Sequence, residues 1–304
     1  MVEEIRFRVG KKIEVITEEF RVFLEQRVTK EEILTLLLKL TDYSLCAYEG
    51  QLKKGFLTIE GGHRIGVAGH MNEGIHTLSD ISGVNIRIAH ECIGCGEEIA
   101  KLIQKKNGVY HTLFVSPPGL GKTTYLRDTI RVLSHRGYKI SVVDERSEIG
   151  ACFCGEPQND LGPCTDIMDN CSKSEGMMML LRSMSPRIIA VDEMGGEQDV
   201  EVARKMVYAG VGLLGTVHAD NEEDLLSRSD IRELLKLGII ERLVILEKVM
   251  GKRRYRIYDV ENGRDLPCAG EHSWTLGTQK LPYFMEKSWN TWGVRDFQTS
   301  CIYI

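Results

Sequence analysis

A glycine-rich loop between an apolar run and a helical pattern constrains the fold of this chain more than any other feature. The loop is Ser116-Pro-Pro-Gly-Leu-Gly-Lys-Thr123, which matches a phosphate-binding loop except that serine replaces the first glycine. Gly119 and Gly121 allow the backbone to turn its amides inward around phosphate oxygens. The following helix presents its positive N-terminus to the same anion. The order of strand, loop and helix therefore predicts an α/β domain that binds nucleotide phosphates.

The side chains of this loop suit ATP and Mg²⁺ as cofactors. Lys122 is long enough to reach the β- and γ-phosphates, and the Thr123 hydroxyl is suited to bind Mg²⁺. A bare Gly-Lys-Thr often arises by chance, but here the apolar run His111–Ser116 precedes the loop and a helical pattern follows it. The expected nucleotide-binding residues of the loop are Pro118, Gly119, Leu120, Gly121, Lys122, Thr123 and Thr124.

Polar residues follow three other apolar runs in the same part of the chain. Asp144-Glu145 follows one run, Asp192-Glu193 a second, and His218 a third. The carboxyl ends of parallel strands meet at one rim of a sheet, where ligands bind, so we expect these side chains beside the phosphate loop.

Each of these residues has an expected role at that rim. Asp192 would hold Mg²⁺ together with Thr123, and Glu193 would deprotonate the attacking water. Glu145 is the alternative base, and His218 would donate a hydrogen bond to the γ-phosphate. The expected catalytic residues are therefore Lys122, Glu193, Glu145 and His218.

The organisation of the chain indicates two domains. Residues 1–95 are interpreted as a small N-terminal α+β domain, and residues 96–110 as a helix or linker. In residues 111–262, apolar runs alternate with helical patterns, which indicates a parallel sheet covered on both faces. Residues 263–304 show no clear period and are interpreted as an atypical C-terminal tail.

Local patterns predict particular elements in the first domain. Glu4–Arg8 alternates and suits an edge strand. Phe56–Ile59 and Arg64–Gly69 flank a Glu-Gly-Gly turn and predict a β-hairpin. Thr29 and Glu32 match a capping box. The helix that follows them is expected to bury the stripe Ile33, Leu36, Leu37 and Leu40.

Composition and charge exclude several classes of protein. The chain has 39 Lys and Arg against 44 Asp and Glu, so no overall basic excess points to nucleic acid as a partner. The longest uncharged apolar stretch, Met206–Ala219, is shorter than the ~20 residues that span a bilayer. The first twelve residues lack the apolar core of a secretory signal. We therefore expect a cytoplasmic protein.

The nine cysteines are expected to be free thiols. A chain without a secretory signal keeps its cysteines reduced. Cys92 and Cys95 form a CxxC, and Cys152 and Cys154 form a CxC. A structural zinc usually takes four ligands in two close pairs, and nothing in the sequence brings these two pairs together. Free thiols are therefore favoured over a zinc site or a redox CxxC.

With these features in view, residues 3–262 resemble the stage III sporulation protein AA family, a bacterial branch of the secretion ATPase superfamily. The order of the loop, Asp144-Glu145, Ile188–Glu193 and Thr216–Ala219 matches the Walker A loop, Asp box, Walker B and His box of secretion ATPases. The resemblance implies a RecA-like P-loop NTPase core with a small N-terminal α+β domain. The stretches that carry it are EIRFRVG, GGHRIGVAGH, NIRIA, SPPGLGKTT, VVDERSEI, PQNDLG, GMMMLLRSMSPRIIAVDEMGG and GTVHAD.

One departure and two arginines matter under this resemblance. Secretion ATPases usually carry Gly-Glu at Walker B followed by an arginine, whereas this chain has Asp192 before the glutamate and Gly195 near the arginine position. Secretion motors place arginines from the N-terminal domain or linker against the nucleotide phosphates. The resemblance therefore implies a phosphate-binding role for Arg64 in GGHRIG and Arg87 in NIRIA.

The resemblance implies an ATPase that acts as a homo-hexameric motor in sporulation. It would power assembly of, or transport through, the channel between mother cell and forespore. Its implied partners are membrane-embedded channel proteins of the same operon, which would hold it at the membrane from the mother-cell cytoplasm. Two other functions stay open: a nucleic-acid-dependent RecA-like ATPase, and a structural module that only binds nucleotide. The basic run Lys252-Arg253-Arg254 would serve the first of these, although a solvated hairpin tip is the simpler interpretation.

Overall fold

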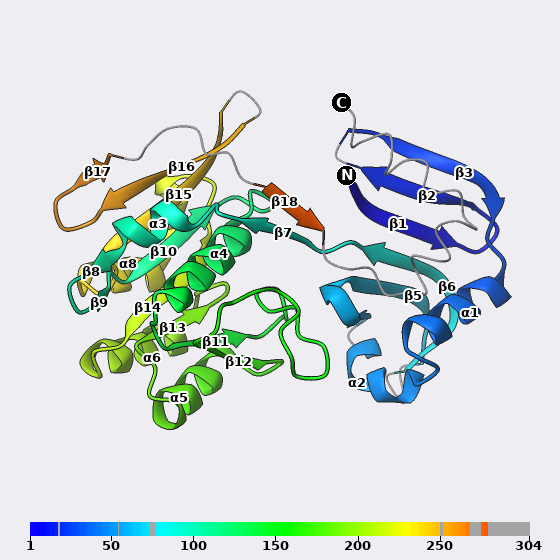
Figure 1. The fold of residues 1–304 in the computed structure, drawn as a ribbon, viewed down its shortest axis with the longest axis horizontal. Coiled ribbons are helices and arrows are strands. Elements are labelled where there is room, and N and C mark those ends of the chain that lie inside the picture. Colours follow the sequence, from blue (N-terminus) through cyan, green and yellow to red (C-terminus); the bar gives the residue numbers. More distant parts are fainter. Residues whose placement is uncertain (18, 54, 73–76, 250–251, 268–274, 279–304) are drawn as a thin grey trace. The chain divides into compact units, whose positions relative to one another are not determined.

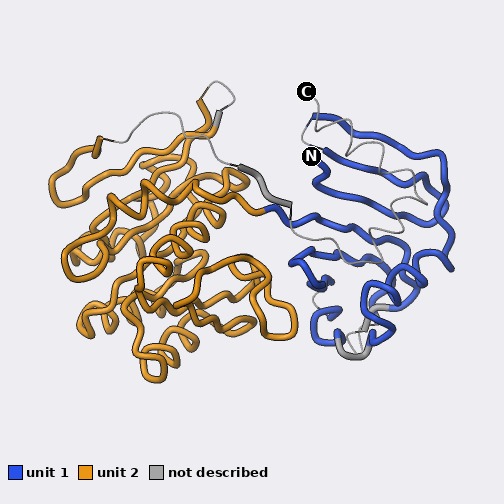
Figure 2. Tube along the Cα trace, viewed as in Figure 1, with its two compact units in different colours: residues 1–90, 278–304 blue, residues 91–277 orange. Residues whose placement is uncertain are grey.

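The computed structural model describes residues 1–17, 19–53, 55–72, 77–249, 252–267 and 275–278 of the 304-residue chain. These residues form two compact units (Figure 1, Figure 2), the first containing Met1–His90 and Thr278, and the second containing Glu91–Gly277. Most of the expected tail, residues 263–304, lies outside the described residues. Among the described helices, none is both long enough and apolar enough to cross a membrane.

Unit 1 is built on a six-stranded sheet in the order β3-β2-β1-β6-β5-β4, in which every neighbouring pair is antiparallel. The predicted hairpin is confirmed as β4 and β5. The helical segments of this unit are α1, which covers the sheet, the short α2 (Glu49–Leu52), and the 3-10 turns Leu45–Tyr48 and Glu60–Gly62. The strands are β1 (Val2–Arg8), β2 (Lys12–Thr17), β3 (Arg21–Arg27), β4 (Phe56–Thr58), β5 (Arg64–Asn72) and β6 (Thr77–Arg87).

The prediction that Glu4–Arg8 forms an edge strand is wrong in one respect. The segment is a strand, but β1 pairs with β2 on one side and with β6 on the other, so it lies inside the sheet. Ile5 and Phe7 are buried, whereas Arg6 between them is only partly buried. Such alternation indicates that one face of a strand is covered. It does not indicate whether the strand has one neighbouring strand or two.

Helix α1 (Lys30–Leu40) begins as predicted. Thr29 Oγ1 accepts the N–H of Glu32, and the Glu32 carboxylate accepts the N–H of Thr29, which completes the capping box. These two hydrogen bonds satisfy two backbone N–H groups that would otherwise need water. The expected stripe is buried against the sheet and consists of Ile33, Leu36, Leu37 and Leu40.

Unit 2 is built on an eight-stranded sheet in the order β12-β11-β13-β14-β10-β15-β16-β17. The first six of these strands are parallel to their neighbours, and β16 and β17 extend the sheet antiparallel. Two small pairs, β7 with β18 and β8 with β9, lie outside it. The strands are β7 (His90–Ile93), β8 (Gln104–Lys105), β9 (Gly108–Val109), β10 (Thr112–Ser116), β11 (Ile140–Asp144), β12 (Thr165–Asp169), β13 (Ile188–Val191), β14 (Gly212–His218), β15 (Arg242–Val249), β16 (Lys252–Asp259), β17 (Arg264–Leu266) and β18 (Thr275–Thr278).

Helices cover both faces of this sheet, as predicted (Figure 1). Phe114 of β10 lies in an apolar cluster with residues of α3 and α4, whereas its neighbours Leu113 and Val115 lie in a second cluster with residues of α5, α6 and α8. Successive strand residues point to opposite faces, so the two clusters mark the two faces of the sheet. The helices are α3 (Glu97–Leu102), α4 (Lys122–His135), α5 (Lys173–Ser183), α6 (Glu197–Tyr208), α7 (Glu222–Ser227) and α8 (Ser229–Lys236).

Candidate active site

The phosphate loop joins the buried strand β10 to helix α4. Gly119 and Gly121 have φ values of 80° and 95°, in the left-handed region that favours glycine. Helix α4 begins at Lys122 and runs for 14 residues, so its first turn brings free backbone amides and the positive end of the helix dipole to the loop. Nη1 of Arg253 adds charge here, because it lies 4.0 Å from the position that a Cβ atom on Gly121 would take. The loop is thus built to receive an anion.

The Lys122 side chain crosses its own loop and reaches β14. The residue is 5% exposed. Its Nζ donates to the carbonyl oxygens of Ser116 at 3.0 Å and Pro117 at 3.2 Å, and to Nδ1 of His218 at 2.8 Å. Burial lowers the pKa of Lys122, and the nearby carboxylates of Asp192 and Glu193 oppose this effect. The ammonium group is therefore held by neutral acceptors, for which phosphate oxygens would be stronger replacements.

The contact with Lys122 determines the tautomer of His218. An ammonium group only donates hydrogen bonds, so Nδ1 of His218 must accept and the ring proton must lie on Nε2. That Nε2 atom donates to Oε1 of Glu193 at 2.9 Å. The imidazole therefore bridges the loop lysine and the glutamate. This bridge exists because β14 is the sheet neighbour of β10, with His218 paired with Ser116.

Glu193 follows β13 in an unusual backbone conformation. Its φ is +51°, which is uncommon for a residue with a side chain and is typical of functional sites. Its N–H donates to Thr216 Oγ1 at 2.8 Å, and Lys173 donates to its carbonyl oxygen. Its carboxylate accepts from His218 and forms an ion pair with Arg146 at 2.9 Å. Contacts on backbone and side chain together aim the carboxylate at the His218 ring.

Thr123 and Asp192 present oxygen ligands that fit Mg²⁺. Thr123 Oγ1 donates to Oδ2 of Asp192 at 3.4 Å, and Thr216 Oγ1 donates to Oδ1 of the same carboxylate. Within the described ranges, no three His, Cys, Asp or Glu side chains gather in a way that would hold a metal ion by themselves. Mg²⁺ at nucleotide sites commonly uses only one or two protein ligands, because waters and phosphates complete its shell. The pair therefore fits Mg²⁺ that is shared with a nucleotide.

Asp144 and Glu145 are placed differently from each other. The buried Asp144 carboxylate accepts three backbone N–H groups of residues 148–150, at distances of 2.8–3.0 Å. Burial raises the pKa of Asp144 to about 6, although these hydrogen bonds oppose the rise. Asp144 thus organises its own loop. Glu145 is exposed and lies 3.9 Å from Nζ of Lys173, the lysine that also contacts the Glu193 carbonyl.

The structure brings five of the predicted site residues into one network, and these are Lys122, Thr123, Asp192, Glu193 and His218. Glu145 adjoins this network through Lys173. The roles assigned to these residues in binding and hydrolysis stay predictions.

Arg64 and Arg87 belong to unit 1. They are cross-strand partners in β5 and β6. The Arg64 guanidinium lies 3.8 Å from the centroid of the Phe56 ring, and Arg87 Nε lies 3.6 Å from a carboxylate oxygen of Glu4. The two residues are thus neighbours on adjacent strands, with the Glu4 carboxylate beside Arg87, and their phosphate-binding role stays a prediction.

Several residues of the network are not singled out by sequence reasoning. Thr216 lies inside the predicted strand end, and its hydroxyl joins Asp192 to the Glu193 backbone. Arg146 directly follows Glu145, so its position beside a strand end could have marked it as a candidate site residue. Lys173, at the start of α5, carries no local signal, because only the tertiary fold brings it to the Glu193 carbonyl. Arg253, on β16, belongs to the basic run noted in the sequence, but only the tertiary fold brings it to the phosphate loop.

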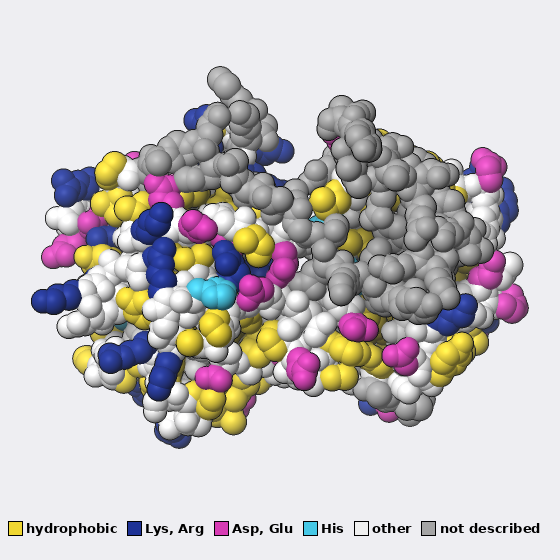
Figure 3. Space-filling view, viewed as in Figure 1, with side chains coloured by type: hydrophobic (Ala, Val, Ile, Leu, Met, Phe, Trp, Pro, Cys, Tyr) yellow, Lys and Arg dark blue, Asp and Glu magenta, His cyan; other side chains and the backbone are white. Residues whose placement is uncertain are grey.

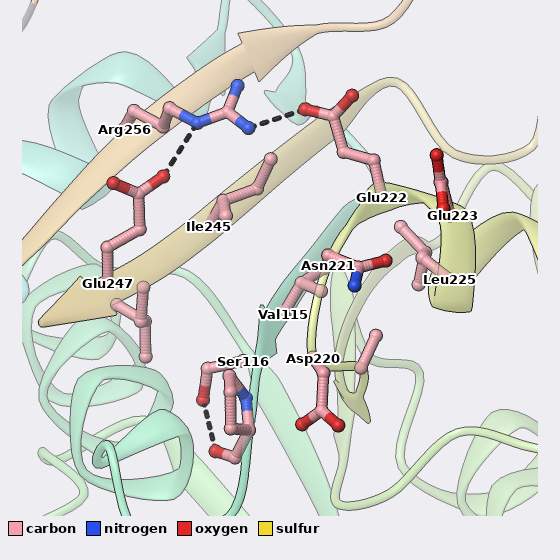
Figure 4. Close-up of a pocket in the computed structure, with 13 residues that line it drawn as sticks. Val115, Ser116, Asp220, Asn221, Glu222, Glu223, Leu225, Ile245, Glu247 and Arg256 are labelled. Carbon is pink, nitrogen blue, oxygen red and sulfur yellow. Dashed lines mark hydrogen bonds and ion pairs between the residues drawn. The ribbon is translucent and has the colours of Figure 1, made fainter.

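A pocket of about 670 Å³ opens beside the first residues of the phosphate loop. Its floor is apolar and includes Val115, Leu225 and Ile245, and Asp220 and Glu223 line its sides (Figure 4). Arg256 crosses its rim between Glu222 and Glu247, to which it donates (Figure 4). The pocket shows that the rim of the sheet beside the loop is open.

The cysteines of the two predicted pairs lie in different environments. Cys92, Cys95 and Cys152 are buried thiols, and Cys154 is exposed. Burial raises the pKa of Cys152 to about 12. Cys95 donates to the backbone oxygen of Cys92 at 3.3 Å.

Solved structures of an ATPase and of a pilus retraction motor share this fold. The Legionella pneumophila ATPase DotB superposes with a TM-score of 0.60 at 15% identity, covering 85% of this chain and 77% of DotB. The pilus retraction motor PilT, solved with bound ADP, superposes with a TM-score of 0.60 at 16% identity, covering 99% of this chain and 86% of PilT. These likenesses confirm the predicted α/β fold with a P-loop NTPase core.

Sequence comparison identifies the family. Stage III sporulation protein AA of Bacillus subtilis (strain 168) is 38% identical over 268 residues, which cover 85% of this chain and 87% of that protein. The uncharacterized protein ycf45 of Cyanidium caldarium is 29% identical over 168 residues, covering 55% of this chain and 49% of that protein. The model of the family described as "Sporulation stage III, protein AA" matches residues 1–265. With this match and the identity to the Bacillus protein over most of both chains, the chain belongs to the sporulation stage III protein AA family.

Proposed function

We propose that this chain is an ATPase that hydrolyses ATP to ADP and phosphate and drives a motor in sporulation. The observation that carries the proposal is the hydrogen-bonded path from Lys122 through His218 to Glu193, beside the pair Thr123 and Asp192. It joins the proposed phosphate-binding lysine, the proposed base and two proposed Mg²⁺ ligands at one rim. The fold shared with DotB, named as an ATPase, and PilT, named as a motor, supports the proposal.

The residues of the path have distinct proposed roles. Lys122 exchanges its carbonyl partners for β- and γ-phosphate oxygens. Thr123 and Asp192 would hold Mg²⁺, which when bound would neutralise charge on those phosphates. Glu193 takes a proton from the attacking water while the water oxygen bonds to the γ-phosphorus and the bond to the ADP oxygen breaks. His218 keeps its Nε2 proton on the Glu193 side of the ring and so aligns the carboxylate.

Glu193 is the proposed base in preference to Glu145. The Glu193 carboxylate touches the ring that touches Lys122, whereas Glu145 is exposed and has Lys173 as its ion-pair partner. A base must come within hydrogen-bond reach of the water that it activates. The position of Glu193, one imidazole ring away from the loop lysine, supports this choice.

The assembly follows the resemblance to secretion ATPases. We propose a homo-hexamer with ATP at subunit boundaries, where Arg64 and Arg87 supply positive charge to the transition state. Membrane-embedded channel proteins of the same operon are the proposed partners, and the motor acts from the mother-cell cytoplasm on the channel to the forespore.

Nucleic acid is not a proposed partner. Arg253, from the basic run that would have contacted it, lies beside Gly121 of the phosphate loop. On the face of unit 2 shown in Figure 3, lysine and arginine side chains are interspersed with acidic and apolar ones. Nucleic-acid-binding surfaces instead gather basic side chains in a patch or stripe.

Steady-state ATP hydrolysis by the purified full chain tests the proposal. We expect Mg²⁺-dependent release of phosphate that DNA and RNA leave unchanged and that Lys122→Ala abolishes. Tight ATP binding without turnover would favour the structural module instead. Strong stimulation by DNA or RNA would favour the nucleic-acid-dependent enzyme.

A further inference from the structure

The side chain of Arg228 joins the two segments that carry Glu193 and His218. Arg228 lies between α7 and α8. Its Nη2 donates to the carbonyl oxygen of Met194, the residue after Glu193, at 3.1 Å. Its Nη1 donates to the carbonyl oxygen of His218 itself at 3.5 Å. One guanidinium group therefore spans the exits of β13 and β14.

Asp230 holds this guanidinium in place. Its Oδ2 accepts from Nη2 of Arg228 at 2.9 Å and from the N–H of Gly196 at 2.9 Å. Both side chains are partly buried, with 31% of Arg228 and 13% of Asp230 exposed. A partly buried, hydrogen-bonded pair of this kind has less freedom than a surface ion pair. The pair thus connects α8 to the backbone on both sides of Gly195.

Gly195 provides the space that the guanidinium occupies. A Cβ atom at this position would lie 2.5 Å from Nη2 of Arg228 and 3.4 Å from Oδ2 of Asp230. The first distance is too short for any contact, so a side chain here must displace the guanidinium. The displaced atom is the end of a flexible side chain, so such a change moves Arg228 without disrupting the backbone of the core.

We propose that Arg228 is a positioning residue that sets the distance between Glu193 and His218. The inference rests on the proposed ATPase function, in which these two side chains act together. The Glu193 turn has a positive φ and is anchored by Thr216 and Lys173 on its strand side. Arg228 supplies the link to the His218 segment on the other side. Without Arg228, no guanidinium group would link the backbone after Glu193 to the backbone of His218. The hydrogen bond from Nε2 of His218 to Glu193 would then be less firmly held.

Arginine suits this role for a geometric reason. The planar guanidinium donates in several fixed directions at once, so it can bond to two carbonyl oxygens and a carboxylate together. A lysine ammonium in the same place reaches one or two of these acceptors without fixing their relative positions. Arg228→Lys should therefore retain the charge and lose part of the positioning.

Kinetics of three variants test the proposal. In Gly195→Ala and Arg228→Ala, we expect kcat to fall about tenfold to a hundredfold, as small displacements of reacting groups commonly cause, while KM for ATP changes less than about twofold. Arg228→Lys should lie between these variants and the wild type. The matched controls are Gly50→Ala, where a Cβ meets no atom within 4 Å, and Arg232→Ala, an exposed arginine of α8. Both should keep the wild-type kcat.

A second measurement does not depend on turnover. Nuclear magnetic resonance of the histidine ring nitrogens in the full chain reports the tautomer, and the His218 signals are assigned by their absence from His218→Asn. In the wild type we expect a proton on Nε2 only. In Gly195→Ala and Arg228→Ala we expect the chemical shifts of the two ring nitrogens to become more alike, because the two tautomers then mix.

The outcomes separate this proposal from the proposed function. Wild-type His218 signals in both Gly195→Ala and Arg228→Ala would overturn the positioning role, whatever the rate of hydrolysis. A fall in melting temperature with unchanged kcat and unchanged His218 signals would also overturn it, because Arg228 would then be only structural. If the wild type does not hydrolyse ATP, the proposed function fails, and the His218 signals alone decide the role of Arg228.

Discussion

Nζ of Lys122 lies 2.8 Å from Nδ1 of His218, although the two residues are 96 positions apart in the chain. The contact joins the exits of two neighbouring parallel strands, β10 and β14. Through the other ring nitrogen it continues to Glu193 at the exit of β13. One imidazole ring therefore connects the loop lysine to the candidate base.

Lys122→Ala should abolish hydrolysis and weaken ATP binding. The variant removes the positive charge that the β- and γ-phosphates would meet at the N-terminus of α4. Binding is measured by titration with a fluorescent ATP analogue, and turnover by phosphate release. Lys139→Ala, a lysine outside the loop and before β11, serves as the control. Wild-type turnover in the Lys122 variant would refute the phosphate-binding role of the loop.

Glu193→Gln should bind ATP and fail to cleave it. Glutamine keeps the shape of the side chain and a hydrogen-bonding oxygen, but it does not take up a proton from water. The measurement is the ratio of ATP to ADP retained on the protein after rapid gel filtration. Glu145→Gln is the matched variant and should turn over. The reverse pattern, with ATP trapped by Glu145→Gln alone, would make Glu145 the base.

His218→Ala should hydrolyse ATP slowly and bind ADP normally. The variant removes the Nε2 hydrogen bond that aligns Glu193. Loss of one such bond in the transition state costs about 1–3 kcal/mol, which corresponds to about a tenfold to hundredfold lower rate. Parallel measurement of turnover, ADP affinity and melting temperature tests this. A variant that unfolds or loses ADP affinity to the same degree would show that His218 has a structural role instead.

Arg64→Ala and Arg87→Ala should each lower hydrolysis about tenfold or more in the assembled protein while leaving the oligomer intact. Each change removes a positive charge that we propose acts on the transition state. Light scattering with ATP measures the oligomer, and phosphate release measures the rate. Arg21→Ala, an exposed arginine on β3, is the control. Full specific activity in a wild-type protein that stays monomeric with ATP would contradict the proposed ring.

Asp144 should make the stability of the chain depend on pH. Burial raises its folded pKa to about 6 from the ordinary value of 3.8, so the folded state binds the proton more tightly than the unfolded state. The contribution of this group to stability is then complete below about pH 4 and is lost as the pH rises through about 6. Relative to Asp144→Asn, which does not titrate, the wild type should lose about 1 kcal/mol of unfolding free energy between about pH 5 and pH 7.

Urea unfolding of both proteins at the two pH values measures this difference. The Asn variant is expected to be less stable at both, because its amide group faces a backbone N–H that the carboxylate accepts. A difference between the two proteins that stays constant or grows with pH would contradict the raised pKa.

Some contacts of the site escape sequence reasoning for a definite reason. Glu145 and Glu193 look equivalent in the sequence, since each is the second acid after an apolar strand. They differ because β13 adjoins β14, whereas β11 does not, so only Glu193 comes within reach of His218. Strand β12 is missed for a related reason, because TDIMD carries two aspartates and lies at the edge of the sheet, where no apolar run is required.

The sequence by itself determined the phosphate loop, the strand ends that converge on it and the capping box at Thr29, because glycine backbone freedom, strand polarity and helix capping are local properties. The tertiary structure alone decided which side chains meet. The order of the strands in the sheet, β11-β13-β14-β10, differs from their order in the chain, and that arrangement places His218 between Lys122 and Glu193. The tertiary structure also brings Arg228 to the space beside Gly195. Contacts between residues this far apart in the chain depend on how the helices pack on the sheet.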